Sequence, residues 1–375
     1  MPISVPFFDW AGLWAERADD FARVMNDTAS RGGFILQRDV DEFETGLSEF
    51  LGVKHVIALS DGTNAMHLGL RACGIKPGDE IILPSHGFIA AAQAIHFAGA
   101  IPVPVEMNES DWLIDTADVE RAITPRTVGI MPVHVNGRVC DMASLETICA
   151  KRGLQLFEDA AQAAGARFQG RPAASFGKWG TFSFYPSKTL GSFGDAGALA
   201  TEHDDVAESV RTMRNHGAGS DKSIPKDVTV WGTNSRLDNL QAAILVYKLS
   251  YYQEAIDRRR MIARRYDEAF RQISELRLPP PPTEAGDHYD IFQNYEMRAG
   301  DRREALRAHL AAQGIGTIVQ WGGTGIHQFC GLGFTQDLPR TDAFFRESLL
   351  LPMNHILSDQ QVDHVIDSVR KFYAQ

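Results

Sequence analysis

The chain has 375 residues, too many for one hydrophobic core of ordinary size, so its length predicts two domains. Its 44% hydrophobic and 23% charged residues are typical of a soluble globular protein. A net charge of −11 argues against non-specific nucleic-acid binding, which requires a cationic surface.

Short apolar, β-prone runs recur through the first half of the chain and predict seven strands, at residues 56–59, 81–83, 101–105, 128–133, 154–157, 181–185 and 198–201. Helical patterns such as TNAMHLGLRACG and IAAAQAIHFAGA separate most of these runs. The runs are too apolar for a sheet with one face in water. They predict an α/β domain of three layers (α/β/α) around a seven-stranded, mostly parallel sheet. We place this large domain, with an N-terminal arm, at residues 1–250.

The pattern changes from residue 235 onward. Residues 235–273 have a 3.6-residue periodicity with no internal proline or glycine, which predicts one long helix or two abutting ones. The string LPPPPTEAGD then predicts an extended connector. A strand in IFQNYEMRA, a helix in DRREALRAHLAAQG, a strand in GTIVQW and a final helix in DQQVDHVIDSVRKFYA follow it. These elements predict a smaller C-terminal α+β domain at residues 251–375.

Several kinds of segment and site have no sequence signal. The four cysteines show neither CxxC spacing nor the density of a disulfide scaffold, which favours free thiols in a reducing compartment. No apolar stretch is long enough to span a bilayer, and the first residues lack the pattern of a signal peptide. The 12 histidines form no HExxH or other paired ligand motif, so no metal is predicted. We therefore expect a cytoplasmic protein that binds neither membrane nor nucleic acid.

Lys188 and Asp159 carry the strongest chemical signal. Lys188 follows the strand predicted at 181–185 and precedes a glycine-rich stretch. Asp159, in FEDAAQA, follows an earlier strand at its carboxyl end, where open α/β sheets bind ligands. A lysine amine can bond to the aldehyde of pyridoxal phosphate, while a carboxylate holds the pyridine nitrogen protonated. The pair predicts a pyridoxal-phosphate enzyme, although Asp159 could instead be an ordinary helix N-cap.

Further polar residues predict a binding site for the rest of that cofactor. Gly62 allows a tight turn, and Thr63 and Asn64 open a helix whose free N–H groups and partial positive charge suit a phosphate. Ser183 could join the phosphate site, and Gln162 could reach the cofactor's 3-hydroxyl. An ordinary helix cap and an ordinary strand serine are the alternatives. No Walker-type loop or dinucleotide fingerprint occurs, so ATP and NAD have no support.

Together these segments resemble the DegT/DnrJ/EryC1/StrS family of sugar aminotransferases, which belong to the fold-type I pyridoxal-phosphate enzymes (the aspartate aminotransferase fold). The matching strings are DGTNAMHLGLRACGIKPGDEIILPS, GIMPVHVNGRVCDM, FEDAAQAAGA, FSFYPSKTLGSFGDAGAL, MRNHG and NSRLDNLQAAIL. Several ordered motifs at compatible spacing are hard to obtain by chance. The resemblance runs from roughly Gly33 to the C-terminus and is strongest between Val56 and Leu245.

The resemblance implies roles for the residues already singled out. Lys188 would bond covalently to the cofactor, Asp159 would partner the pyridine nitrogen, and Gln162 would bind the 3-hydroxyl. The phosphate would be held by Thr63, Asn64 and Ser183.

Two further residues enter through the resemblance alone. Phe88, in LPSHGFIAAAQAI, falls where the family places an aromatic ring stacked on the pyridine, although a core phenylalanine is the alternative. Asn234, in GTNSRLD, matches an asparagine that reaches the phosphate across a dimer interface. The resemblance therefore implies a homodimer with shared active sites.

The chain departs from the family near the expected substrate. The string SHGF replaces the commoner Ser-Phe-Thr-Phe and brings His86 near the expected cofactor. The string QWGGTGIHQF replaces a Tyr-Pro-x-Pro-Leu-His pattern in a segment that should approach the substrate. Trp321 and His327 are the candidate substrate contacts there, with a structural role as the open alternative.

The resemblance implies a ping-pong transamination, from an amino acid to a nucleotide-linked keto sugar. The resemblance implies L-glutamate, the usual donor in this family, as the amino donor. The WGG string favours a dTDP-4-keto-6-deoxyhexose as the acceptor. Sugar dehydratases related to the family replace the lysine by histidine, so the presence of Lys188 argues against that activity. Two alternatives stay open: a same-fold enzyme of elimination or aminoaromatic formation, and a catalytically silent cofactor-binding scaffold or regulator.

Overall fold

A seven-stranded sheet forms the centre of the protein, whose computed structural model describes residues 3–218 and 228–374. The strand order is β1-β9-β8-β5-β4-β2-β3. Strand β9 is antiparallel to β1 and β8, and the pairs β2–β3, β2–β4, β4–β5 and β5–β8 are parallel. The strands are β1 (His55–Leu59), β2 (Glu80–Pro84), β3 (Ile101–Val105), β4 (Thr127–Ile130), β5 (Gln155–Asp159), β8 (Trp179–Ser183) and β9 (Gly197–Thr201). The predicted seven-stranded, mostly parallel sheet is confirmed.

Helices cover both faces of this sheet, as the strand alternation requires. In β1, Val56 and Ala58 pack into one hydrophobic cluster, whereas Ile57 and Leu59 pack into another. The first cluster includes residues of α3 (Arg38–Leu51), α6 (Thr116–Ala122), α7 (Met142–Arg152) and α9 (Asn239–Leu249). The second includes residues of α4 (Gly62–Ala72), α5 (Ile89–Phe97) and α8 (Asp204–Met213). The sheet therefore lies between two helical layers, which confirms the three-layer prediction.

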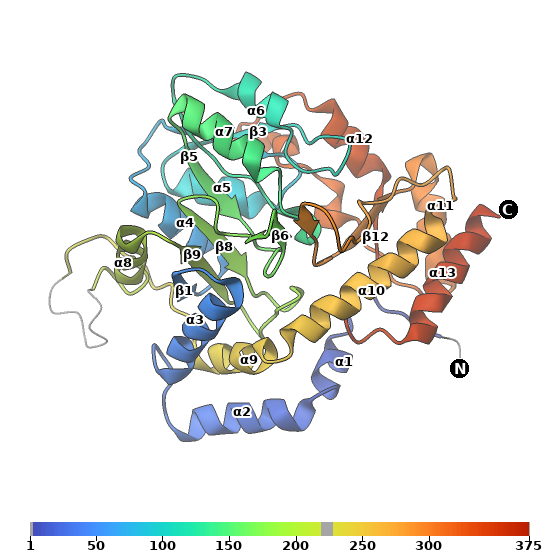
Figure 1. The fold of residues 1–375 in the computed structure, drawn as a ribbon, viewed down its shortest axis with the longest axis horizontal. Helices are drawn as coiled ribbons and strands as arrows, with labels where there is room; N and C mark the ends of the chain where they lie inside the picture. The colour runs from blue at the N-terminus through green and yellow to red at the C-terminus, as the bar shows by residue number, and fades with distance from the viewer. Residues whose placement is uncertain (1–2, 219–227, 375) are drawn as a thin grey trace.

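Helix α10 (Tyr252–Phe270) connects this body to the smaller C-terminal part (Figure 1). Ala255 and Ile256 in its first half pack into the sheet's cluster, whereas Tyr266 and Phe270 pack into a separate one. That separate cluster also receives Val5 from the N-terminal arm. Its elements are the antiparallel pair β11 (Tyr295–Arg298) and β12 (Ser348–Leu351) with α11 (Arg303–Ala312) and α13 (Asp359–Tyr373). The boundary between residues 250 and 251 stays a prediction.

Shorter elements complete the described parts of the chain. Three helices, α1 to α3, precede the first strand of the sheet, and α2 packs on α9. Among the described residues, no helix combines the length and the apolar composition that a bilayer crossing needs. The remaining elements are α1 (Trp10–Ala15), α2 (Ala18–Ser30), α12 (Pro339–Glu347), β6 (Arg167–Phe168), β7 (Arg171–Pro172), β10 (His288–Tyr289), and the 3₁₀ turns η1 (Val135–Gly137), η2 (Gly300–Arg302), η3 (Gln320–Gly323), η4 (Ile326–Gln328) and η5 (Cys330–Leu332).

The C-terminal predictions were correct for helices and partly wrong for strands. The long periodic segment forms two helices, α9 and α10, which was one of the two options. The strand predicted in GTIVQW is wrong, because only Ile318 makes an isolated bridge, to Leu350. Trp321 and Gly322 then adopt left-handed backbone angles, φ 50° and 72°, which turn the chain out of an extended conformation. This turn brings the QWGG segment to the site described next.

Candidate active site

A cavity of about 420 Å³ opens where several strands of the sheet end. Its volume lies in the range of small-molecule sites. On this side of the sheet, Gly62 follows the end of β1, Phe88 follows the end of β2, and Asp159 is the last residue of β5. The predicted cofactor residues that line the cavity are Gly62, Thr63, Phe88, Asp159, Gln162, Ser183 and Lys188. The fold thus brings together motifs that span more than a hundred residues of sequence.

One corner of the cavity is the N-terminus of α4. Asp61 is the N-cap, and its side chain accepts a hydrogen bond from Asn64 N at 2.8 Å. The N–H groups of Gly62 and Thr63 precede the first intrahelical bond and have no acceptor among the described residues. A Cβ built on Gly62 would lie 3.2 Å from the Cβ of Ser183, so the serine borders this corner. Free N–H groups and a hydroxyl at a helix N-terminus suit a phosphate.

Asn64 does not face this corner. Its Nδ2 donates to Asp61 Oδ2 at 2.7 Å, and its backbone N–H is the one that Asp61 caps. Since these donors are bonded to Asp61, Asn64 serves the cap and does not line the cavity.

Asp159 ends β5 with a buried carboxyl group. Its Oδ1 accepts from Ala161 N at 3.0 Å, and no donor among the described residues reaches its other oxygen. Burial raises the pKa of Asp159, against the opposing effects of the Ala161 N–H and the positive charge of Lys188. The neighbouring Glu158 points away and accepts from backbone N–H groups of residues 174, 176 and 177. Asp159 therefore presents an acceptor that lacks a protein donor.

Lys188 lies on the loop that follows β8 and is half-buried. Burial lowers the pKa of its ammonium group to about 8, and the negative charge of Asp159 opposes that shift. At pH 7 about a tenth of such an amine is neutral, far more than of an ordinary lysine. The neutral amine is the form that attacks an aldehyde.

Gln162 presents its amide N–H₂ group to the cavity. Its Oε1 accepts from the backbone N of Asn136 at 2.6 Å, which fixes the orientation of the amide. Asn136 adopts a left-handed conformation, φ 57°, within η1. The Nε2 of Gln162 has no acceptor among the described residues and is a donor for a ligand oxygen.

These groups fit pyridoxal phosphate. The α4 corner suits its phosphate, Asp159 offers an acceptor to a pyridinium N–H, and Gln162 offers a donor to the 3-oxygen. Lys188 supplies an amine with a lowered pKa. Phe88, with 53% of its surface exposed, is not a core residue and offers a ring at the cavity wall.

The expected substrate residues are divided between the cavity and its support. Trp321 lines the cavity, and the ring of His86 packs behind it with the centroids 5.4 Å apart. His86 also bonds through Nδ1 to the carbonyl oxygen of Trp112 at 2.8 Å. His327 is buried, with Nδ1 2.6 Å from Ser85 Oγ and Nε2 3.0 Å from Asp342. Neither histidine lines the cavity.

Asn234 is exposed and lies outside the cavity of its own chain. It pairs with Asn215 through an isolated backbone bridge. The preceding residues expose apolar side chains, with Trp231 86% exposed and Val228 58%. This placement leaves Asn234 free to contact a second molecule.

Other lining residues were not singled out in the sequence. They come from the N-terminal arm, the loop after β8 and the approach to β11, and include Phe7, Phe8, Tyr185, Asp195, Gln293 and Asn294. Tyr185 and Asp195 lie in the matching string FSFYPSKTLGSFGDAGAL around Lys188, whereas the other four lie outside every matching string.

Comparison with known proteins agrees with the geometry. The sequence profile of the DegT/DnrJ/EryC1/StrS aminotransferase family matches residues 16–370. A dTDP-3-amino-3,4,6-trideoxy-alpha-D-glucose transaminase of Streptomyces venezuelae is 36% identical over 372 residues, 98% of this chain and 96% of that protein. A pleiotropic regulatory protein of Geobacillus stearothermophilus is 35% identical over 377 residues, 99% of each chain. The solved structure of S. venezuelae DesV with a ketimine intermediate has a TM-score of 0.93 and 36% identity, with both chains fully covered.

The lowered pKa of Lys188 predicts how cofactor attachment depends on pH. The rate at which the apo-protein bonds pyridoxal phosphate should rise with pH through a midpoint near 8, because only the neutral amine reacts. Asp159→Asn should move the midpoint lower, since the carboxylate favours the charged ammonium. Stopped-flow recording of the visible absorption band of the attached cofactor measures the midpoint in the wild type and in Asp159→Asn. The variant Asp204→Asn, at an exposed position, is the control. A midpoint near 10 in the wild type would contradict the assignment.

Proposed function

Since the chain belongs to the DegT/DnrJ/EryC1/StrS aminotransferase family and is a pyridoxal-phosphate-dependent aminotransferase, we propose that its acceptor is a keto sugar carried on a nucleoside diphosphate. The proposed amino donor is L-glutamate. The observation that carries the proposal is the single cavity lined by Lys188, Asp159 and the α4 corner. The named S. venezuelae relative, a transaminase of a dTDP-linked sugar, supports the acceptor class.

The chain's own residues have the following proposed roles in holding the cofactor. Thr63, Gly62 and Ser183 bind the phosphate, and Gln162 donates to the 3-oxygen. Asp159 pairs with the pyridine nitrogen, and the positive charge there favours the ionised carboxylate despite its burial. When bound, pyridoxal phosphate supplies a ring that takes up the electron pair left when a substrate carbon loses its proton.

Lys188 performs the proton transfers. In the first half-reaction its neutral Nζ would accept the proton from the α-carbon of the amino acid and deliver it to the former aldehyde carbon of the cofactor. In the second half-reaction it would take a proton from that cofactor carbon and deliver it to the carbon that was the sugar carbonyl. A pKa of about 8 suits both tasks near neutral pH, because the amine can lose and regain its proton at little cost.

The sugar specificity rests on the wall that contains Trp321. The WGG string favours a dTDP-4-keto-6-deoxyhexose, whereas the S. venezuelae relative is named for a 3-amino sugar. We therefore propose a dTDP-linked keto-deoxyhexose and keep amination at C4 as the specific prediction. Trp321 lines the cavity with His86 packed behind it, which suits an apolar contact with a deoxygenated sugar.

We also propose that two copies of the chain form a homodimer in which Asn234 of each completes the phosphate site of the other. Asn234 is exposed and lies outside its own cavity, and it follows the exposed apolar residues Val228, Val230 and Trp231. Contiguous exposed apolar surface is typical of an interaction site.

A panel of keto sugars tests the function. The protein, saturated with pyridoxal phosphate and L-glutamate, is given 3-keto and 4-keto 6-deoxyhexoses linked to dTDP, UDP or GDP. We expect equal amounts of 2-oxoglutarate and amino sugar, with kcat/KM for the dTDP-4-keto sugar at least about tenfold above the others. Mass spectrometry and NMR identify the product and the position of the amine.

The same panel distinguishes the alternatives. A preference for a 3-keto isomer or another nucleotide would contradict the specific acceptor and leave the reaction class intact. Release of water or ammonia without amine transfer would favour elimination. A bound cofactor that no amino acid changes would favour a silent scaffold or regulator.

A mixing experiment tests the shared site. Asn234→Ala and Lys188→Ala subunits should each be nearly inactive alone, because one loses the phosphate contact and the other the amine. After subunit exchange, equal amounts should recover about a quarter of wild-type activity, since about half of the dimers contain one complete site. Absence of recovery from a mixture that demonstrably exchanges subunits would rule out the proposed contribution of Asn234.

A further inference from the structure

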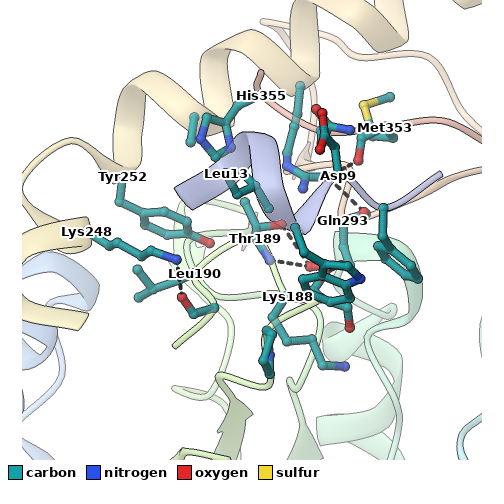
Figure 2. A pocket seen from close by; sticks show the side chains of 18 of the residues that line it. Asp9, Leu13, Lys188, Thr189, Leu190, Lys248, Tyr252, Gln293, Met353 and His355 are labelled. Carbon is teal, nitrogen blue, oxygen red and sulfur yellow. Dashed lines mark hydrogen bonds between the residues drawn. The ribbon is translucent and has the colours of Figure 1, made fainter. Parts of the chain in front are cut away.

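Gln293 contacts the chain on both sides of Lys188 (Figure 2). Its Oε1 accepts from the backbone N of Thr189 at 2.7 Å and from Thr189 Oγ1 at 2.8 Å. Its Nε2 donates to the carbonyl oxygen of Ser187 at 2.8 Å. One side chain from the approach to β11 therefore holds both residues that flank the lysine.

The Gln293 amide satisfies both contacts at once. Thr189 N–H requires an acceptor, and the carbonyl oxygen of Ser187 requires a donor, so the amide cannot be turned around. A glutamate would keep the acceptor and place a carboxylate oxygen against the Ser187 carbonyl. A leucine would remove all three hydrogen bonds. Of these three side chains, only glutamine satisfies both partners.

Gln293 is itself fixed from the side away from the cavity. It is 5% exposed, and its backbone N donates to Asn136 O at 2.9 Å. The buried guanidinium of Arg259, on α10, donates through Nη1 to the carbonyl oxygens of Gln293 and Met353, each at 2.9 Å. Burial lowers the pKa of Arg259 to about 10, so the group is still a cation at neutral pH. Charge-assisted bonds hold the Gln293 backbone in place.

A second contact holds the far end of the same loop. Lys248, on α9, donates to the carbonyl oxygen of Gly191 at 2.6 Å (Figure 2). Its Nζ also lies 4.6 Å from the centre of the Phe193 ring. This contact lies three residues past Lys188. Gln293 is therefore the closer of the two, and it lines the same cavity as the lysine.

We propose that Gln293 is a positioning residue that fixes the backbone of Lys188, so that its Nζ reaches the reacting carbon in one geometry. The backbone N of Lys188 bonds to Tyr185 O at 2.8 Å, a local turn that does not tie the loop to the rest of the protein. A group that moves protons must be held within a fraction of an ångström, and misplacement by about 1 Å can lower the rate about 100-fold. The inference rests on the proposed role of Lys188 and goes beyond it.

Replacement of Gln293 by leucine and by glutamate tests the proposal. Gln293→Leu should lower the rate of pyridoxal-phosphate attachment and the kcat of the glutamate half-reaction by about 10–100-fold. KM for glutamate should change by less than about threefold, because no substrate contact is removed. Gln293→Glu, which keeps the acceptor for Thr189, should lose less than Gln293→Leu. Gln253→Leu, at an exposed glutamine of α10, is the matched control and should match the wild type.

Expressing kcat per cofactor-bound subunit separates positioning from stability. If the role of Gln293 is purely structural, its replacement will lower the melting temperature and leave kcat per occupied site unchanged. That result would overturn the proposal. If Gln293→Leu does not fold, Gln293→Glu provides the test. An attachment rate and kcat equal to those of the wild type would overturn the proposal, and a loss in both would uphold it. A wild-type protein that forms no visible band would instead refute the role of Lys188.

Discussion

A buried carboxylate and a half-buried lysine act on each other across one cavity, and the rest of the site depends on that pair. Burial raises the pKa of Asp159 and lowers that of Lys188, while the charge of each opposes the shift of the other. The sheet produces this arrangement because β5 and β8 are neighbours, with Asp159 in register with Thr181. Lys188 follows seven residues later, after the strand has ended. A cofactor with a cationic ring nitrogen and an aldehyde matches the two groups.

Much of the fold could be predicted because burial leaves a clear pattern in sequence. Strands covered on both faces are apolar throughout, so the runs at β1, β2 and β8 stood out. The C-terminal part gave weaker signals. The apolar string at 316–321 looks like a strand, yet Trp321 takes a left-handed conformation that ends any extended run there. Strand β12 was missed, since it follows α12 with no glycine or proline between them.

The site could be predicted where residues follow the ends of strands. Gly62, Asp159 and Lys188 do so, and their spacing is set by local structure. Residues that act through distant contacts gave no such signal. Gln293 bonds to Thr189, which is 104 positions away in the sequence, and His327 contacts Ser85, which is 242 positions away. The histidine that was expected at the substrate is therefore a buried link between two parts of the fold.

The most direct test of the account is the absorption spectrum of the purified protein with pyridoxal phosphate, before and after excess L-glutamate, beside Lys188→Ala. The account predicts a visible band in the wild type that glutamate converts to the spectrum of the pyridoxamine form. The variant should lack the band, and its transamination should fall by about 10²–10⁴-fold, as expected for a lost general acid–base group. A wild-type protein that forms no band, or a variant that forms the same band, would contradict the assignment of Lys188.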